Sequence, residues 1–291
     1  MNFKAKYDGY KEEFEKELEN VLQSLNCKPD ILSESMIYSL KLGGKRIRPV
    51  LMFAVGDLLQ IERRKLYKFA VALEFIHTYS LIHDDLPEMD NDDFRRGKPS
   101  NHKVFGAGNA ILAGNGLLNT AYSILFNECF KGEEYISASK YICDCAGIFG
   151  MLAGQSADLL HENDKNVENS ILDFIYENKT SKLLSAAVVT PSILCKGKYF
   201  AELTVFSKEL GLLFQYVDDI LDVEGNFETT GKSVGKDSVE GKYTSVKLFG
   251  LEGCKLKADV LADKLDKILE GFSGETEFIK ELVYFIRQRT N

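Results

Sequence analysis

Two acidic clusters have the residue types and spacing that bind divalent cations. The first reads Asp-Asp-Leu-Pro-Glu-Met-Asp at residues 84–90, and the second reads Asp-Asp-Ile-Leu-Asp at residues 218–222. Each follows an apolar stretch with helical periodicity. Mg²⁺ in proteins is typically held by one or two carboxylates together with substrate phosphates. The clusters therefore predict a site for divalent cations.

Helical spacing places two carboxylates of the second cluster on one face. Asp218 and Asp222 are four residues apart, so their side chains are neighbours on an α-helix. Two unit charges about 4 Å apart repel by about 4 kcal/mol at an effective dielectric constant near 20. A positive group, such as a hard divalent cation, should offset this repulsion.

In the first cluster, a proline interrupts the helical pattern. Pro87 can end the helix and let Asp90 fold back toward Asp84. A solvated acidic helix end is the alternative interpretation for either cluster alone. Two such clusters, each at the end of an apolar helix, make that alternative the weaker one.

Basic residues gather beside these acids. The run Gly-Gly-Lys-Arg-Ile-Arg-Pro occupies residues 43–49, and Arg-Arg-Gly-Lys-Pro occupies residues 95–99. Glycines let backbone N–H groups approach an anion, and arginine offers a two-pronged fork for phosphate oxygens. A surface charge run is the alternative for each segment taken singly. In a chain of net charge −8, their position beside the acidic clusters indicates a metal–diphosphate site.

The elements that must position these residues are predicted to be helices. Apolar residues recur every three or four positions along most of the chain, whereas no hairpin signal or sustained alternation predicts a strand. We expect the segment 65–86 to be central and buried. The fold class is all-α, a large single-domain bundle of about ten helices over residues 1–291 around a central cavity. The expected helical segments are 3–25, 31–42, 50–60, 65–86, 107–127, 134–160, 168–191, 199–224, 243–270 and 275–288.

Composition excludes several classes of protein. The acidic charge argues against a general nucleic-acid or anionic-membrane surface. Six scattered cysteines without a Cys-x-x-Cys pair indicate free thiols rather than a zinc site. The polar N-terminus is not a signal peptide, and no segment has the apolar length of a membrane span. We therefore expect a cytoplasmic protein.

An ordered set of motifs resembles the trans-isoprenyl diphosphate synthase family over nearly the whole chain. The span from Asp84 to Asp90, with two extra residues in the motif, is similar to that of bacterial-type farnesyl diphosphate synthases. Asn91 and Phe94 depart from the family pattern, and residues 287–291 match its basic end only loosely, so we assign no role there. The matching segments are 43–49, 74–90, 95–97, 154–159, 179–180, 215–222 and 230–232.

The resemblance implies an Mg²⁺-dependent homodimer that joins isopentenyl diphosphate to an allylic diphosphate. It implies about three Mg²⁺ ions, for which Mn²⁺ can substitute. The implied metal ligands are Asp84, Asp85, Asp90, Asp218, Asp219 and Asp222. The implied contacts to the allylic substrate are Arg95, Lys179, Thr180, Gln215, Lys232 and Lys242. Isopentenyl diphosphate is assigned to Lys45, Arg48, His77 and Arg96. The residues expected to act in catalysis are Asp84, Asp85, Arg95, Lys179, Asp218 and Lys232.

Helical geometry supports part of this assignment. His77 lies seven residues before Asp84, so an ideal helix places both on one face. A lone histidine on such a helix is otherwise more often a core residue. Tyr79 and Ser80 lie five and four residues before Asp84 and are expected to set the chain length. Ser80 lies about 40° from Asp84 around the helix axis and so should face the growing chain. The resemblance makes Tyr79 the stopper that limits the product to C15, farnesyl diphosphate.

Other functions remain open at this stage. The same fold could make the C20 product, geranylgeranyl diphosphate, or serve as a terpene cyclase or a non-catalytic partner subunit. Terpene cyclases usually lack the basic run at residues 43–49, because they bind no second diphosphate. A simple cation-binding bundle would have no use for Lys45, Arg48, Arg95 and Arg96.

Overall fold

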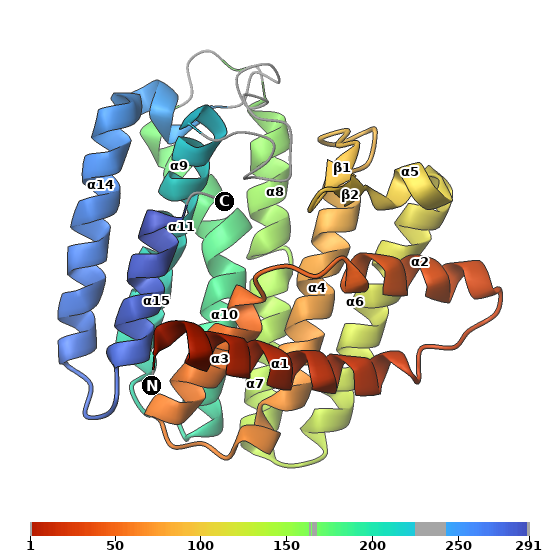
Figure 1. Ribbon diagram of the computed structural model, residues 1–291, viewed down its shortest axis with the longest axis horizontal. Coiled ribbons are helices and arrows are strands. Elements are labelled where there is room, and N and C mark those ends of the chain that lie inside the picture. Colours follow the sequence, from red (N-terminus) through yellow and green to blue (C-terminus); the bar gives the residue numbers. More distant parts are fainter. Residues whose placement is uncertain (1, 163, 165–167, 225–242, 290–291) are drawn as a thin grey trace.

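The computed structural model describes residues 2–162, 164, 168–224 and 243–289, and almost all of its regular structure is helical (Figure 1). This confirms the all-α class. The 3₁₀ turn η1 (Arg63–Lys65) precedes α4, and the π-helical turn η2 (Tyr176–Ser181) joins α9 to α10. The α-helices are α1 (Phe3–Leu22), α2 (Asp30–Lys41), α3 (Ile47–Leu58), α4 (Tyr67–Asp84), α5 (Asn101–Phe105), α6 (Ala107–Cys129), α7 (Glu133–Ala146), α8 (Met151–Leu160), α9 (Asn169–Ile175), α10 (Lys182–Leu194), α11 (Phe200–Glu224), α14 (Ser245–Glu270) and α15 (Glu277–Gln288).

Three predicted helices are divided in the structure, and one of them, 243–270, is kinked at Gly250, where φ is 70°. The segment 134–160 breaks between α7 and α8, where Gly147 and Gly150 have non-helical conformations. Glycine is a poor helix former. The prediction used only the apolar periodicity, so it did not take these two glycines into account. The segment 168–191 is divided by η2, and α10 continues past Pro191 to Leu194.

A short hairpin also contradicts the expectation of no strands. β1 (Phe94–Arg95) pairs antiparallel with β2 (Lys98–Pro99). Arg96 and Gly97 form the turn, with φ values of 55° and 73°. Positive φ at both central residues is the mark of the tight turns that suit hairpins, but arginine is an unusual residue at the first position.

Helix α4 lies in the middle of the bundle, as predicted. Its residues from Phe69 to Ile76 are buried, and it packs along α6 while also contacting α3 and α10. Figure 1 shows α4, α6, α8 and α10 roughly upright, with α1 running across α4 and α6 in the lower half of the view. Because this stretch of α4 is apolar on all sides apart from Glu74, it can be covered by neighbours all round. Only its C-terminal end, at Asp84, carries the first acidic cluster.

The ends of α4 and α11 lie at the upper end of the bundle in Figure 1. The second acidic cluster falls in the last two turns of α11. Within the described part of the chain, no helix is long and apolar enough to cross a membrane. All six cysteines are free thiols, as expected.

Candidate active site

The first acidic cluster folds back on itself, as the proline predicted. The backbone N–H of Asp90 donates to the carbonyl of Asp84 at 2.8 Å, and that of Met89 donates to Leu86 at 2.9 Å. Pro87 is exposed at the outside of this turn. The turn therefore brings the backbones of the first and last acids of the cluster into contact at the end of α4.

Asp85 is turned away from that pair. Its side chain is only 3% exposed and accepts hydrogen bonds from Arg95, with a distance of 2.9 Å from Nε to Oδ1. Arg95 also lies 3.3 Å from Asp92. Burial lowers the pKa of Arg95, but the carboxylates of Asp85 and Asp92 outweigh burial and raise it, so the guanidinium stays charged. In this structure the carboxylate of Asp85 therefore faces Arg95, and its expected role as a metal ligand stays a prediction.

Asp219 is likewise engaged inside the protein. It accepts hydrogen bonds from the Ser245 backbone N–H at 2.7 Å, from the Ser245 hydroxyl at 2.6 Å and from the Tyr176 hydroxyl. Gln215 donates to its other oxygen at 3.0 Å. Burial raises the pKa of Asp219, and these hydrogen bonds act in the opposite direction. Asp219 therefore ties α11 to η2 and α14, and its expected role as a metal ligand stays a prediction.

Asp218 and Asp222 remain accessible on α11, and Asp218 already forms an ion pair with Arg289. Arg289 donates to the carboxylate of Asp218 and to the carbonyl of Phe214 at 3.3 Å, and its guanidinium lies 3.9 Å from the centre of the Phe214 ring. Arg289 had no predicted role, because residues 287–291 match the family's basic end only loosely, although that basic end was the available signal. Its position meets the need for positive charge beside Asp218.

Three residues predicted to contact the allylic substrate come together on η2 and α11. Lys179 lies 2.5 Å from Asp158, and the hydroxyl of Thr180 donates to Gln215 at 2.8 Å. The turn fits closely against α8, because a side chain at Gly154 would collide with the backbone of Lys179. The structure thus gathers these side chains, while Lys232 and Lys242 lie outside the described residues.

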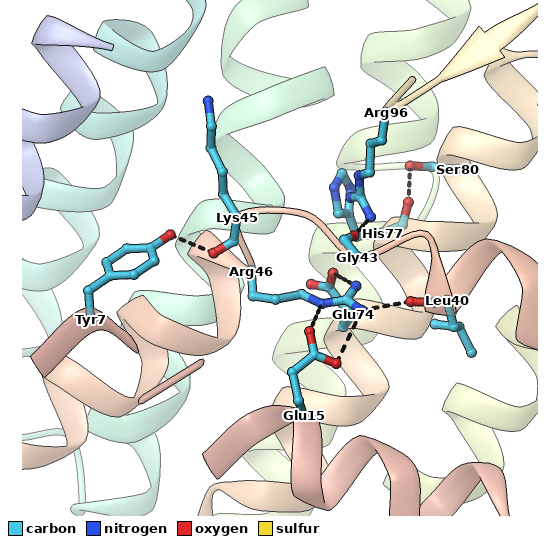
Figure 2. A network of polar contacts seen from close by, with 10 residues as sticks. All are labelled: Tyr7, Glu15, Leu40, Gly43, Lys45, Arg46, Glu74, His77, Ser80 and Arg96. Carbon is cyan, nitrogen blue, oxygen red and sulfur yellow. Dashed lines mark hydrogen bonds and ion pairs between the residues drawn. The ribbon is translucent and has the colours of Figure 1, made fainter. Parts of the chain in front are cut away.

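Of the four residues assigned to isopentenyl diphosphate, Lys45, Arg48 and Arg96 are cations, and His77 lies among them. Figure 2 shows His77 and Arg96 beside Gly43, whose carbonyl accepts a hydrogen bond from Arg96. Burial lowers the pKa of Arg48 to about 10, and Nε of Arg48 has no hydrogen-bond partner among the described residues. Burial, followed by the charges of Arg48 and Arg96, lowers the pKa of His77. Such crowding of cations favours an anion between them.

Lys45 belongs to this group and links it to the second cluster. Burial and the charge of Arg289 lower its pKa to about 8, while Asp218 acts in the opposite direction. Asp218 also raises the pKa of Arg48 against the effect of burial. Asp218 is therefore close enough to interact electrostatically with two of the three cations of the basic run, Lys45 and Arg48.

The carboxylates suit a metal that arrives with its substrate. Among residues that the structure describes, no three acidic, histidine or cysteine side chains are arranged to hold an ion. Mg²⁺ retains water readily and needs only one or two carboxylates when phosphates supply other ligands. The accessible pair on α11 and the folded-back pair at the end of α4 fit that requirement.

Tyr79 lies deeper along α4, below the first cluster. Its side chain is buried, and burial raises the pKa of its hydroxyl. The ring meets His83 edge-on, with centroids 5.6 Å apart. Its hydroxyl has no hydrogen-bond partner in the described structure, whereas the Ser80 hydroxyl donates to the carbonyl of His77 at 2.9 Å.

Comparison with known proteins gives consistent matches. The sequence pattern of the polyprenyl synthetase family matches residues 29–283. Over 266 residues the chain is 41% identical to the farnesyl diphosphate synthase of Bacillus subtilis, covering 90% of both chains. It is 43% identical over 250 residues to the chloroplastic geranylgeranyl pyrophosphate synthase of Capsicum annuum, covering 84% of this chain and 68% of that protein.

Solved structures agree with this relationship. A geranyltransferase from Legionella pneumophila superposes with a TM-score of 0.87 at 32% identity, covering 98% of this chain and 96% of that one. A geranyltransferase from Helicobacter pylori, complexed with magnesium and isoprenyl diphosphate, superposes with a TM-score of 0.83 at 29% identity, covering 97% and 96% respectively. The likeness therefore includes both sequence and fold.

Proposed function

The chain belongs to the polyprenyl synthetase family, and we propose that it condenses isopentenyl diphosphate with dimethylallyl or geranyl diphosphate. The products are farnesyl diphosphate and free diphosphate. The observation that carries this proposal is a partly buried group of three cations, Lys45, Arg48 and Arg96, with His77 among them, next to accessible acids that suit Mg²⁺. Two anion sites side by side are what a reaction between two diphosphates requires.

The cation group also separates this function from the alternatives. A terpene cyclase or a cation-binding bundle has no second diphosphate for Lys45 and Arg48 to bind. Acids in both clusters argue against a non-catalytic subunit. A C20 product is the remaining alternative, since geranylgeranyl synthases are also among the relatives.

We assign the metal ligands to four of the six predicted acids. Asp84 and Asp90 would hold Mg²⁺ on one side of the allylic diphosphate, and Asp218 and Asp222 would hold it on the other. Bound Mg²⁺ supplies Lewis-acid stabilisation of the leaving diphosphate. The support is the turn at the end of α4 and the cation that stands against Asp218.

The protein's own groups act around this centre. Lys179 and Arg95 stabilise the negative charge that develops on the diphosphate as the allylic C–O bond breaks. The alkene of isopentenyl diphosphate then attacks the allylic cation, and the departing diphosphate takes up the proton. No side-chain base is needed. Apolar side chains of the helix bundle keep water from the cation.

The direct test is product analysis by mass. The purified protein is incubated with Mg²⁺, isopentenyl diphosphate and either dimethylallyl or geranyl diphosphate. We expect farnesyl diphosphate as the main product with both starters. The absence of any prenyl product at saturating Mg²⁺ would overturn the proposed function.

Substitutions should separate the two diphosphate sites. Lys45→Ala or Arg48→Ala should raise the KM for isopentenyl diphosphate about tenfold or more, because each removes a charged contact to phosphate. Arg95→Ala should instead change the KM for the allylic substrate or lower kcat. Steady-state kinetics with one substrate varied at a time measures this difference. If Lys45→Ala weakens only the allylic substrate, the assignment is wrong.

We also propose a homodimer formed through α6 and its neighbours. The large side chains of Phe126, Phe130 and Phe149 are 65%, 78% and 81% exposed, and Leu112 is 55% exposed. Exposed apolar surface of this kind on adjoining helices marks a protein interface. Sedimentation should show a dimer at micromolar concentration, and Phe126→Asp should shift it toward monomer. A stable monomer of the unmodified protein would contradict the proposal.

A further inference from the structure

We propose that helix α1 is a positioning element of the isopentenyl diphosphate site. Its side chains Tyr7 and Glu15 hold the basic segment (residues 43–49) in the conformation that places Lys45 and Arg48. α1 ends at Leu22, before the residues 29–283 that match the family pattern. The inference rests on the proposed function, because it assigns support to a site where isopentenyl diphosphate would bind.

The basic segment adopts a backbone shape that needs outside support. Gly43, Gly44 and Arg46 have φ values of 76°, 129° and 52°. Glycine accepts such values freely, but arginine in the left-handed region is disfavoured. A conformation of this kind persists only where the surrounding structure holds it. We therefore expect the contacts of the Arg46 side chain to stabilise this backbone conformation.

The side chain of Arg46 is held by groups from three elements (Figure 2). Its guanidinium donates to Glu15 of α1 at 2.8 Å, to Glu74 of α4 at 2.8 Å and to the carbonyl of Leu40 at 2.6 Å. The side chains of Arg46 and Glu74 are only 1% and 2% exposed. A buried arginine with this many partners has one available position, which fixes the backbone on either side of it.

Tyr7 holds the neighbouring residue from the same side. Its hydroxyl donates to the carbonyl of Lys45 at 2.5 Å. Figure 2 shows that carbonyl facing Tyr7, while the Lys45 amine extends away from it. The centroids of the Tyr7 and Phe285 rings are 5.7 Å apart, so α15 packs against the tyrosine that makes this hydrogen bond. One hydroxyl therefore fixes the peptide from which the Lys45 side chain extends.

The consequence for binding follows from this geometry. Without the Tyr7 hydroxyl, the carbonyl of Lys45 loses its partner and the peptide can rotate. The amine would then occupy many positions in place of one, and its contact to phosphate would weaken. The allylic site, built on η2 and α11, has no contact with Tyr7 among the described hydrogen bonds. The effect should therefore be confined to isopentenyl diphosphate.

The test compares two tyrosines of α1. Tyr7→Phe removes the hydroxyl that reaches Lys45, and Tyr10→Phe removes the hydroxyl of a second buried tyrosine, which donates to Asp57 of α3 at 2.5 Å. We expect Tyr7→Phe to raise the KM for isopentenyl diphosphate about tenfold, the effect of one lost contact, with the KM for geranyl diphosphate unchanged. Tyr10→Phe should leave both KM values unchanged. Thermal unfolding of both variants measures any loss of stability.

A second variant keeps the inference testable if Tyr7→Phe does not fold. Glu15→Gln weakens one bond to Arg46 and should raise the same KM by a smaller factor. The inference is overturned if the KM for isopentenyl diphosphate is unchanged in the folded variants, or if Tyr10→Phe raises it equally. If the unmodified protein does not use isopentenyl diphosphate at all, the proposed function fails instead, so the two failures are distinguishable.

Discussion

Asp84→Ala and Asp218→Ala should each lower turnover by about a thousandfold or more while leaving the protein helical. Each cluster is expected to hold Mg²⁺ on one side of the leaving diphosphate, where a metal stabilises the developing charge by several kcal/mol. About 4 kcal/mol of lost stabilisation corresponds to about a thousandfold in rate. Turnover at saturating Mg²⁺ measures the effect, and circular dichroism verifies the helical fold.

A matched control lies inside the first cluster. Glu88 is exposed on the turn after Pro87 and is not assigned to the metal. Glu88→Ala removes a carboxylate from the same segment and should change turnover by no more than about twofold, as surface substitutions usually have small effects. Near-normal activity of Asp84→Ala or Asp218→Ala would show that the clusters do not hold the catalytic metal.

The fold was predictable where local sequence decides it. The helical class, the central position of α4 and the reversal at Pro87 all depend on periodicity or on a single proline. The division between α7 and α8 and the hairpin of β1 and β2 were missed. The hairpin turn has Arg96 at a position where φ is positive, and the hydrogen bond from its side chain to Gly43 helps to hold it there. A contact across 53 residues cannot be read from a short motif.

The site was predictable by residue type but not by orientation. Adjacent acids such as Asp84 and Asp85 have the same chemistry, and the sequence does not say which one meets a buried arginine. Arg95 holds the carboxylate of Asp85 inside the protein by hydrogen bonds. Ser245, 26 residues away from Asp219, does the same for the carboxylate of Asp219. Arg289 reaches Asp218 across 71 residues. Orientation within each cluster therefore depends on partners that only the tertiary structure brings close.

Product length depends on what lies beneath the first acidic cluster. The diphosphate of the growing chain stays at the acids, so the hydrocarbon must extend away from them. Tyr79 lies five residues before Asp84, about 7.5 Å along α4 at 1.5 Å per residue. A buried tyrosine hydroxyl usually finds a partner, and that of Tyr79 has none among the described residues. The ring of Tyr79 packs edge-on against His83, so an aromatic surface lies beneath the acids.

Tyr79→Ala should shift the products from C15 toward C20 and longer when geranyl diphosphate is the starter. Removing the ring opens space beneath the acids, and the chain can add further isoprene units before it meets a wall. Tyr79→Phe is the matched control, because it keeps the ring, loses only a hydroxyl without a partner, and should still stop at C15. Mass analysis of the products distinguishes the two variants. Tyr79 does not limit the chain if the unmodified protein already makes mainly C20, or if Tyr79→Ala also stops at C15.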